Sequence, residues 1–229
     1  MVPGLSMKKP APASPQPSRD CPVCPRLAAF RESIRAREPD WHNAPVPSFG
    51  GPDARLLVVG LAPGLRGANR TGRPFTGDWA GDLLFATLLK FGFAKGDYQE
   101  RPDDGLALQD CMITNAVRCV PPENKPTPAE IRDCRIFLEP TIETNRKLIA
   151  LVALGRIAHD SVVRALGQKL SSVPFGHGAQ HTIMQANGKA IRLFDSYHCS
   201  RYNTNTGVLT TQMFEDVFRS VRTFVDESA

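Results

Sequence analysis

The residues best suited to chemistry lie between Gly60 and Asp78, in the run GLAPGLRGANRTGRPFTGD. This run holds five glycines, three arginines, one phenylalanine and, at its end, a single acid. Glycine lets a backbone approach a ligand closely, and arginine favours an anionic ligand. The run follows the apolar stretch LLVV at 56–59, which is typical of a strand buried on both faces. A binding loop at the carboxyl end of a parallel strand is therefore predicted here.

Two phosphate-binding motifs are excluded by the same run. Gly67 and Gly72 are separated by four residues, as in a P-loop, but an Arg-Pro pair follows where that loop requires Lys and then Ser or Thr. Gly60, Gly64 and Gly67 do not fit the dinucleotide pattern G-x-G-x-x-G. Hydrolysis of nucleoside triphosphates and binding of dinucleotides are therefore not expected.

Polar residues also follow two other predicted strands. Asn115 ends the short apolar run that begins at Cys111, and His198 follows the strand predicted at 190–194. Alone, Asn115 would be a turn residue and His198 a structural histidine. Because the carboxyl ends of parallel strands meet at one edge of a sheet, we expect both side chains beside the Gly60 loop. In one crevice, Asn115 would be the group that recognises the ligand, and His198 would be the electrophile.

Four of the six cysteines have the spacing of metal ligands. Cys21 and Cys24 form a CxxC pair, while Cys119 and Cys134 lie far downstream with fourteen residues between them. In a chain without an export signal, such cysteines are more often ligands than disulfides. Four thiolates suit a [4Fe–4S] cluster or a structural zinc ion, and the spacing alone does not separate the two. Cys111 is expected to be a buried apolar side chain.

The elements that must position these residues alternate between strand and helix. Strands are expected at 55–60, 111–115, 148–154 and 190–194, and helices at 27–38, 79–91, 128–145, 156–166 and 208–225. Thr127, Pro128 and Glu130 form a capping box at the start of the third helix, and Thr206 is expected to cap the last. This alternation predicts an α/β fold, a three-layer α/β/α sandwich around a central four-stranded parallel sheet.

Length and composition indicate one domain in the cytoplasm. The chain has 229 residues, 41% of them hydrophobic, which suits a single core over residues 20–229. Residues 1–19 hold five prolines and are predicted to be a disordered tail. No apolar run has the length of a membrane span, and no secretory signal is present. A net charge of +5 favours an anionic partner such as nucleic acid.

The motifs together resemble the uracil-DNA glycosylase superfamily, and most closely its family 5 branch, also called type B. The resemblance rests on Gly60–Gly64, on Gly67–Asp78, on Asn115 after its strand and on the pattern His198-x-Ser200. It extends from about Cys21 to the last predicted helix. It implies a monomeric DNA glycosylase that hydrolyses the N-glycosidic bond of uracil in DNA and starts base excision repair. Other deaminated bases, such as hypoxanthine or xanthine, are expected as further substrates.

The same resemblance implies that the cofactor is iron–sulfur. In this family a CxxC pair near the N-terminus joins two later cysteines that flank a proline-rich segment, as Cys21, Cys24, Cys119 and Cys134 do here. The implied [4Fe–4S] cluster would attach the N-terminal segment to the loop before the capped helix. The reaction requires no redox step from it.

Base recognition follows from the same family motifs. A base inside a duplex must be extruded before it can be cleaved from its sugar. The resemblance implies that Phe75 stacks on the extruded base and that Asn115 hydrogen-bonds its Watson–Crick edge. Ala62 is expected to line the same pocket, and His177, in the loop before the last strand, to complete it.

Catalysis is implied to rest on His198 and Asp78, with Asn115 holding the base. His198 would donate a hydrogen bond to the negative charge that develops on the departing base. Family 4 relatives carry a carboxylate in the first motif, where this chain has Leu61. Asp78 is then the nearest acid that can stabilise the cationic sugar or orient water, although an Asp at this position could also cap the helix from Trp79.

DNA contacts are expected from two loops: Arg66, Arg70 and Arg73 in the first, and Ser200, Arg201 and Tyr202 in the second. The arginines would make binding salt-dependent, and Tyr202 is a candidate wedge. Cys199 stands where the family usually has proline, which questions the rigidity of the His198 loop.

Two alternative functions remain open on the sequence. One is a family 4-like glycosylase restricted to uracil. The other is a non-catalytic iron–sulfur protein that binds nucleic acid, in which Leu61 reflects a lost activity.

Overall fold

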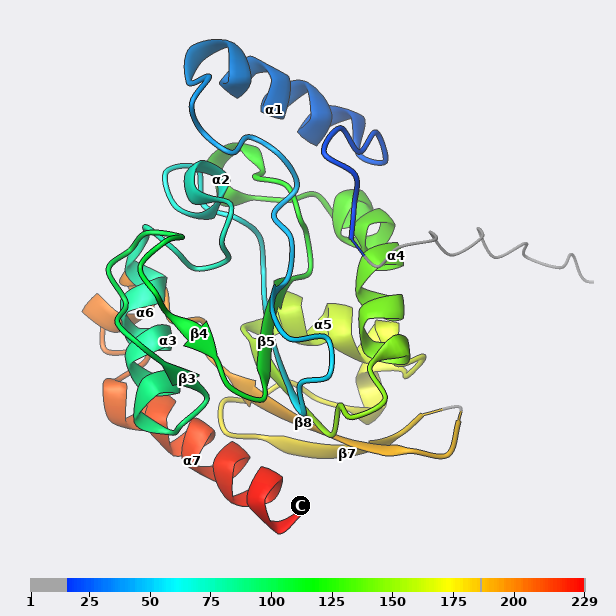
Figure 1. Cartoon of the computed structure of the whole chain (residues 1–229). Coiled ribbons are helices and arrows are strands. Elements are labelled where there is room, and N and C mark those ends of the chain that lie inside the picture. The colour runs from blue at the N-terminus through cyan, green and yellow to red at the C-terminus, as the bar shows by residue number, and fades with distance from the viewer. Residues whose placement is uncertain (1–15, 186, 229) are drawn as a thin grey trace, which may run out of the picture.

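The computed structural model describes residues 16–185 and 187–228, and its centre is a sheet with four parallel strands (Figure 1). The four are β5 (Cys111–Asn115), β2 (Leu56–Gly60), β6 (Ala150–Leu154) and β8 (Ala190–Ser196), in that spatial order. Every residue of β2, β5 and β6 is buried, as continuous apolar runs predict. The predicted parallel core of the sheet is confirmed.

Two antiparallel edge strands extend the sheet beyond the four predicted strands. β1 (Phe49–Gly50) pairs with β5, and β7 (Gln180–Met184) pairs with β8. The sheet is therefore six-stranded and mixed. β1 has only two residues, and β7 is largely exposed, so neither contains an apolar run that a sequence pattern could reveal. A separate two-stranded ribbon joins β3 (Ala94–Lys95) to β4 (Ala107–Leu108).

Helices cover both faces of the sheet because successive residues of each strand point to opposite sides. Leu56 and Val58 of β2 pack with α3 (Trp79–Lys90) and α7 (Thr211–Glu227). Leu57 and Val59 pack instead with α4 (Pro128–Thr144) and α5 (Arg156–Ala165). The three-layer α/β/α arrangement is the one predicted.

Helix boundaries agree with the sequence pattern except near the C-terminus. The capping box of α4 is present, with Thr127 accepting from the Glu130 N–H at 3.3 Å and Glu130 accepting from the Thr127 N–H at 2.7 Å. The last helix begins at Thr211 rather than 208, and its cap is Thr210 instead of Thr206. Residues before it form a separate short helix, α6 (Arg201–Asn205), for which Ser200 is the N-cap. The segment therefore contains two helix caps, Ser200 and Thr210, where the sequence pattern predicts one at Thr206.

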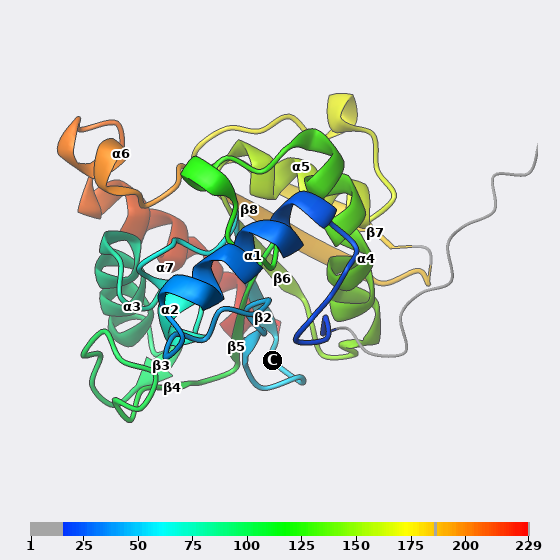
Figure 2. The ribbon, with the colours of Figure 1, turned by 90° about the horizontal axis from the view of Figure 1, so that it is seen from above.

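The N-terminal part lies across the end of the sheet where β2 and β5 terminate. There α1 (Pro25–Arg37) crosses over the sheet, close to α4, and α2 (Ala68–Thr71) lies beside it in Figures 1 and 2. Short 3₁₀ turns occur at Pro122–Asn124 and Leu170–Ser172.

The predicted tail, 1–19, is tested only in part, because residues 1–15 lie outside the described structure. Gln16 accepts hydrogen bonds from the Ser48 N–H at 3.0 Å and from Arg118 Nη1 at 3.3 Å. The packed part of the chain thus begins before residue 20. Among the described residues, no helix has the length and apolar character needed to span a membrane.

Candidate active site and cysteine cluster

A small pocket opens at the carboxyl ends of β2, β5 and β8. Its lining comes from the three loops expected to converge there, and consists of Ala62, Pro63, Gly64, Ala68, Phe75, Asp78, Ala80, Asn115 and His198. The topological expectation that these loops meet is confirmed. Ala62, Phe75, Asp78, Asn115 and His198, five of the predicted site residues, line one cavity.

Phe75 is held in an unusual backbone conformation. Its φ is +55°, a region that non-glycine residues rarely occupy, and its carbonyl accepts a hydrogen bond from the Tyr98 hydroxyl at 3.2 Å. A Cβ on Gly81 would lie 1.9 Å from that carbonyl oxygen, so only glycine fits below it. The ring is buried and nearly parallel to the His198 imidazole, with centroids 6.1 Å apart. Phe75 therefore presents a fixed aromatic face to the pocket.

Asn115 is the last residue of β5 and pairs in register with Gly60. A Cβ on Gly60 would lie 2.5 Å from Asn115 Oδ1 and 2.5 Å from Phe75 Cζ. Any larger residue would displace the side chains of both. The glycine that ends the first parallel strand thus makes room for the amide and the ring together.

Asp78 occupies the N-cap position of α3, but its side chain makes no capping hydrogen bond. Its Oδ1 atom is buried without a hydrogen-bond partner among the described residues. Burial raises the pKa of Asp78, the neighbouring Ala80 and Gly81 N–H groups partly offset this rise, and Asp82 adds to it. One carboxylate oxygen therefore has no partner among the described residues, although the carboxyl group also lies by the first N–H groups of α3.

His198 follows β8 and lies opposite Phe75. Burial lowers the pKa of His198 to about 4, so the imidazole is neutral at pH 7 and carries one N–H. Its backbone carbonyl accepts from Asn203 Nδ2 at 2.8 Å, which anchors the loop to α6. A neutral imidazole in this position is a hydrogen-bond donor and not a cation.

Cys199 replaces the expected proline by a buried anchor. Its side chain is fully buried in the core, and its thiol donates to the Ala80 carbonyl in the first turn of α3 at 3.4 Å. The contact ties the His198 loop to the helix that begins beside Asp78. The loop is thus restrained through packing rather than through a fixed φ.

Arg73 is not a DNA contact, contrary to the expectation from sequence. It is buried and forms a bidentate salt bridge with Asp104, with N–O distances of 2.8 and 2.7 Å. This pairing lowers the pKa of Asp104 well below its ordinary value. The guanidinium also lies over the rings of Phe49, Phe85 and Tyr98. Arg73 therefore braces the loop from inside, whereas Arg66 and Arg70 are exposed as expected.

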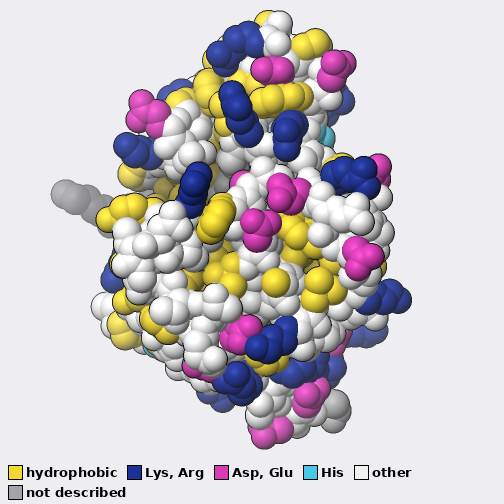
Figure 3. Space-filling model, turned by 90° about the vertical axis from the view of Figure 1, so that its left-hand side faces the viewer, with side chains coloured by type: hydrophobic (Ala, Val, Ile, Leu, Met, Phe, Trp, Pro, Cys, Tyr) yellow, Lys and Arg dark blue, Asp and Glu magenta, His cyan; other side chains and the backbone are white. Residues whose placement is uncertain are grey.

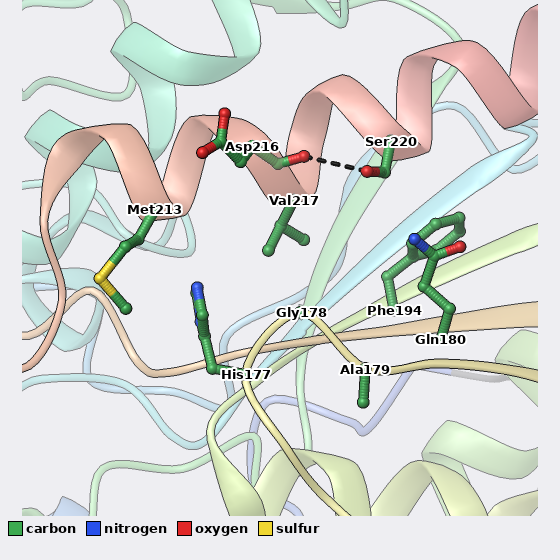
Figure 4. Close-up of a pocket in the computed structure, with 9 residues that line it drawn as sticks. All are labelled: His177, Gly178, Ala179, Gln180, Phe194, Met213, Asp216, Val217 and Ser220. Carbon is green, nitrogen blue, oxygen red and sulfur yellow. Dashed lines mark hydrogen bonds between the residues drawn. The ribbon is translucent and has the colours of Figure 1, made fainter.

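His177 does not complete the pocket, which corrects a second expectation. It stacks on Tyr197 with centroids 4.9 Å apart, and its Nδ1 accepts from the Tyr197 N–H at 3.1 Å. Figure 4 shows it at a different pocket, between the loop before β7 and the side chains of Met213 and Asp216 on α7. The turn at Gly178 places this loop on the side of the sheet that α7 covers.

The second segment that was expected to contact DNA forms the short helix α6 and its N-cap, Ser200. Ser200 uses its hydroxyl to accept from the Asn203 N–H at 3.4 Å, so it acts first as a helix cap. Arg201 lies over the ring of Trp79, 5.4 Å from its centroid, and Tyr202 is 73% exposed. Trp79 was not among the predicted site residues, although its position directly after Asp78 was the signal that could have identified it.

Leu61 lies on the other side of His198 from the pocket. Together with Phe175 and Tyr197 it lines an adjoining apolar hollow that shares His198 as a wall. No carboxylate comes from this position, so Asp78 is the acid that the pocket contains.

The four predicted ligand cysteines lie together below α1. Cys21, Cys24, Cys119 and Cys134 pack in one cluster with Leu27, Val117 and Phe137. Burial, together with the charge of neighbouring cysteines, raises the pKa of the Cys24 and Cys134 thiols to about 12. Thiols in this environment are stable as thiolates only if a positive centre compensates their charge.

Two arginines without a carboxylate partner in the described structure surround the cysteines. Arg31 is 2% exposed and donates to Cys119 Sγ at 3.4 Å, and Arg118 is 1% exposed. The backbone N–H of Arg118 donates to Cys134 Sγ at 3.3 Å. Arg31 Nε and Arg118 Nη2 are buried and have no hydrogen-bond partner among the residues that the structure describes. Buried cations beside four sulfurs fit a site that holds an anionic thiolate cluster.

Across the described residues, no group of three or more His, Cys, Asp or Glu side chains is placed to hold a metal ion. Four cysteines are nevertheless the donor set that either a [4Fe–4S] cluster or a structural zinc ion requires.

A buried ion pair supports the strand that leads to His198. His159 of α5 is 1% exposed, with Nδ1 2.7 Å from Asp195 Oδ1 and Nε2 2.8 Å from the Val173 carbonyl. Both ring nitrogens face acceptors, which is the arrangement of a protonated imidazole. Burial lowers the pKa of His159, but the hydrogen bond and charge of Asp195 outweigh it, so the pKa is raised. His159 therefore has a structural role.

Comparisons with known proteins agree with this site. A family model described as the uracil DNA glycosylase superfamily matches residues 47–222. A type-5 uracil-DNA glycosylase of Thermus thermophilus is 44% identical over 88% of this chain and 92% of its own length. The type-5 enzyme of Pyrobaculum aerophilum is 39% identical over 87% of each chain. A type-4 uracil-DNA glycosylase of Archaeoglobus fulgidus is 30% identical over 73% of this chain and 78% of its own.

Proposed function

The chain belongs to the uracil-DNA glycosylase superfamily, and we propose that it excises uracil from DNA with Asp78 and His198 as its catalytic groups. The enzyme is a hydrolase of N-glycosyl bonds that acts in base excision repair. One observation carries the assignment of residues. A buried carboxylate with an unpartnered oxygen and a neutral imidazole line the same cavity as Phe75 and Asn115.

Recognition of the base uses Phe75 and Asn115. An extruded pyrimidine enters between the carboxyl ends of β2 and β5, and its face stacks on the Phe75 ring. The Asn115 amide offers one donor and one acceptor to the Watson–Crick edge. Both side chains are already fixed by Gly60, Gly81 and Tyr98, so binding orders little of the protein.

Cleavage separates opposite charges between the sugar and the base. As the N-glycosidic bond breaks, positive charge grows on the sugar and negative charge on the base. The Asp78 carboxylate stabilises the cationic sugar and accepts a hydrogen bond from the attacking water. The neutral His198 N–H donates to the anionic base oxygen. No lysine is among the residues that line the described pocket, which favours a monofunctional enzyme without a lyase step.

Uracil release from a synthetic oligonucleotide tests the proposed activity. We expect the purified protein to convert a single uracil to an abasic site that alkali then cleaves, and to leave a thymine control intact. If the protein binds the uracil-containing strand but releases no uracil, the result would instead support the alternative of a non-catalytic nucleic-acid binder.

The range of bases is proposed to extend beyond uracil. The pocket contains the apolar Ala62 and Phe75, and Leu61 adds no carboxylate near the base. Few groups are therefore present that would reject a base with a different edge. Oligonucleotides that carry hypoxanthine or xanthine should be cleaved as well, whereas strict cleavage of uracil would favour the family 4-like alternative.

The cysteine cluster is proposed to hold a [4Fe–4S] cluster. Cys21, Cys24, Cys119 and Cys134 would bind the four irons, and the bound cluster would cross-link α1 to the loop before α4 without a redox role. The two buried arginines would offset the negative charge of the cluster. Iron and sulfide in a brown preparation, at four of each per chain, would support this proposal, and zinc without sulfide would refute it. We further propose that the protein acts in the cytoplasm as a monomer.

A further inference from the structure

The indole of Trp79 lies beside the active site but has no role in the chemistry described above. Trp79 is the first residue of α3, directly after Asp78, and is 47% exposed. Exposed aromatic rings are enriched where proteins bind single-stranded nucleic acid, because every base has a face on which they can stack. The ring therefore needs an explanation at this particular position.

The ring is fixed by two contacts from α6. Its Nε1 donates to Thr204 Oγ1 at 2.9 Å, and the Arg201 guanidinium carbon lies 5.4 Å from the ring centroid. A hydrogen bond at the edge and a cation over the face define the orientation of an indole. The exposed surface is thus preorganised and loses little side-chain entropy when it binds a ligand.

We call the segment around Trp79 the rim of the active-site pocket, because the residues on either side of it in the chain line that pocket. Its neighbours Asp78 and Ala80 both line that pocket, and α6 directly follows the loop that carries His198. Trp79 and Arg201 thus join the two segments that hold the catalytic groups. A DNA strand that inserts one base into the pocket must bring an adjoining nucleotide past this rim.

The charges around Trp79 favour a base over a phosphate. Asp82 lies in the same first turn of α3, and the charges of Asp82 and Glu100 add to the rise that burial causes in the pKa of Asp78. Figure 3 shows that the face with α3 and α6 mixes acidic, basic and hydrophobic side chains. The carboxylates repel a phosphate, whereas the face of a nucleobase is uncharged and stacks on indole and guanidinium alike.

We propose that Trp79 and Arg201 form a stacking platform for a nucleobase of the DNA substrate other than the target base. The platform rests on the proposed function, since it names how the strand is held just outside the catalytic pocket. It assigns Arg201 to base stacking rather than to a phosphate contact.

Tryptophan fluorescence tests the platform directly, because the chain has two tryptophans, Trp41 and Trp79. In a Trp41→Phe variant only Trp79 emits. We would titrate it with an oligonucleotide that carries 2′-fluoro-2′-deoxyuridine, which resists cleavage, and 5-bromouracil at either flanking position. Stacking should quench the emission as DNA saturates the protein, most strongly with the heavy atom on the stacked base. A Trp79→Phe protein, in which only Trp41 emits, should show no such quenching.

Binding measurements provide the second arm of the experiment. Trp79→Ala should weaken binding of the uncleavable oligonucleotide about tenfold and raise KM more than it lowers kcat. Thr204→Val keeps the ring but removes its hydrogen bond, so it should give a smaller loss. Met184→Ala removes an equally exposed apolar side chain from edge strand β7 and should bind as wild type does.

Unchanged Trp79 emission at DNA concentrations that saturate the protein would overturn the platform. The same Trp41→Phe protein is assayed in parallel for uracil release from a cleavable strand. Quenching without release would overturn the proposed activity but leave the platform intact, and release without quenching would do the reverse.

Discussion

Asp78 combines a catalytic position with an environment that disfavours its charge. Its raised pKa means that the folded protein binds the proton of this carboxyl group more tightly than the unfolded chain does. This group therefore destabilises the fold when ionised. The cost is absent below the unfolded pKa of 3.8, grows as the pH rises from there, and is complete above the raised folded pKa. Such a conflict between stability and function is common at active sites.

Asp78→Asn should accordingly stabilise the protein while it removes activity. We expect a higher Tm than wild type at pH 7, no gain at pH 3, and a loss of uracil release of about a hundredfold or more. Calorimetry at the two pH values, together with single-turnover assays, measures both effects. The exposed Asp97→Asn is the matched control, and it should change neither. A lower Tm for Asp78→Asn at pH 7 would contradict the assigned environment.

Some residue roles were visible in the sequence and others were not. Asn115 and His198 could be placed because each follows an apolar run whose end is fixed by the sheet. The role of Arg73 could not, because its partner Asp104 lies 31 residues away in an irregular segment. His177 was misplaced because nothing in its loop indicates on which side of β8 the turn at Gly178 lies.

At the scale of elements, the His198 loop is restrained by packing where relatives of this branch were expected to use proline. Cys199→Ala would remove a fully buried thiol and its bond to Ala80. The expected cost is about 1 kcal/mol in stability and several-fold in uracil release, because the loop loses its anchor beside Asp78.

Cys111→Ala is the control for that variant. Cys111 is equally buried but lies in β5, and its thiol bonds only to a neighbouring backbone carbonyl among the described contacts. It should lose similar stability and keep full uracil release. Equal release by the two variants would show that the thiol of Cys199 does not position the loop.

The ion pair between His159 and Asp195 couples α5 to the end of β8. Because the folded pKa of His159 is raised above 6.5, its contribution to stability is complete below the unfolded pKa and is lost as the pH rises through the folded pKa. His159→Gln should therefore cost about 3 kcal/mol at pH 6 and clearly less at pH 9. Urea unfolding at both pH values measures this difference.

His181→Gln is the matched control for the pair. His181 Nε2 lies 3.8 Å from Asp195 Oδ2, beyond hydrogen-bond distance, and its side chain is partly exposed. Its substitution should cost less than that of His159 at either pH. A cost for His159→Gln that grows with pH would contradict a protonated imidazole at this position.

Whether a strand can be predicted from the sequence depends on whether both of its faces are buried. β2, β5, β6 and β8 carry apolar runs because helices cover both faces of the sheet there. β7 alternates and is largely exposed, so its sequence resembles that of a loop. The short helix α6 also has no core stripe, since none of its residues is buried.

At the scale of the whole molecule, the cysteine cluster joins the N-terminal segment to the rest of the protein. Arg31 supplies a buried positive charge beside Cys119. Arg31→Met should leave the thiols but weaken the proposed [4Fe–4S] cluster, with faster loss of iron and sulfide to a chelator. Arg37→Met, an exposed change in the last turn of the same helix, should lose iron at the wild-type rate. Equal rates for the two variants would show that Arg31 does not stabilise a cluster.

The division of labour between Asp78 and His198 is the central claim, and single-turnover uracil release from an oligonucleotide tests it most directly. We predict rapid release by the wild-type protein and losses of a hundredfold or more in both Asp78→Ala and His198→Ala. Release by Asp78→Ala should stay low at every pH, whereas wild-type release should fall towards that low level in acid as Asp78 is protonated. Full release by Asp78→Ala would contradict the account, because the pocket would then have to obtain its acid from elsewhere.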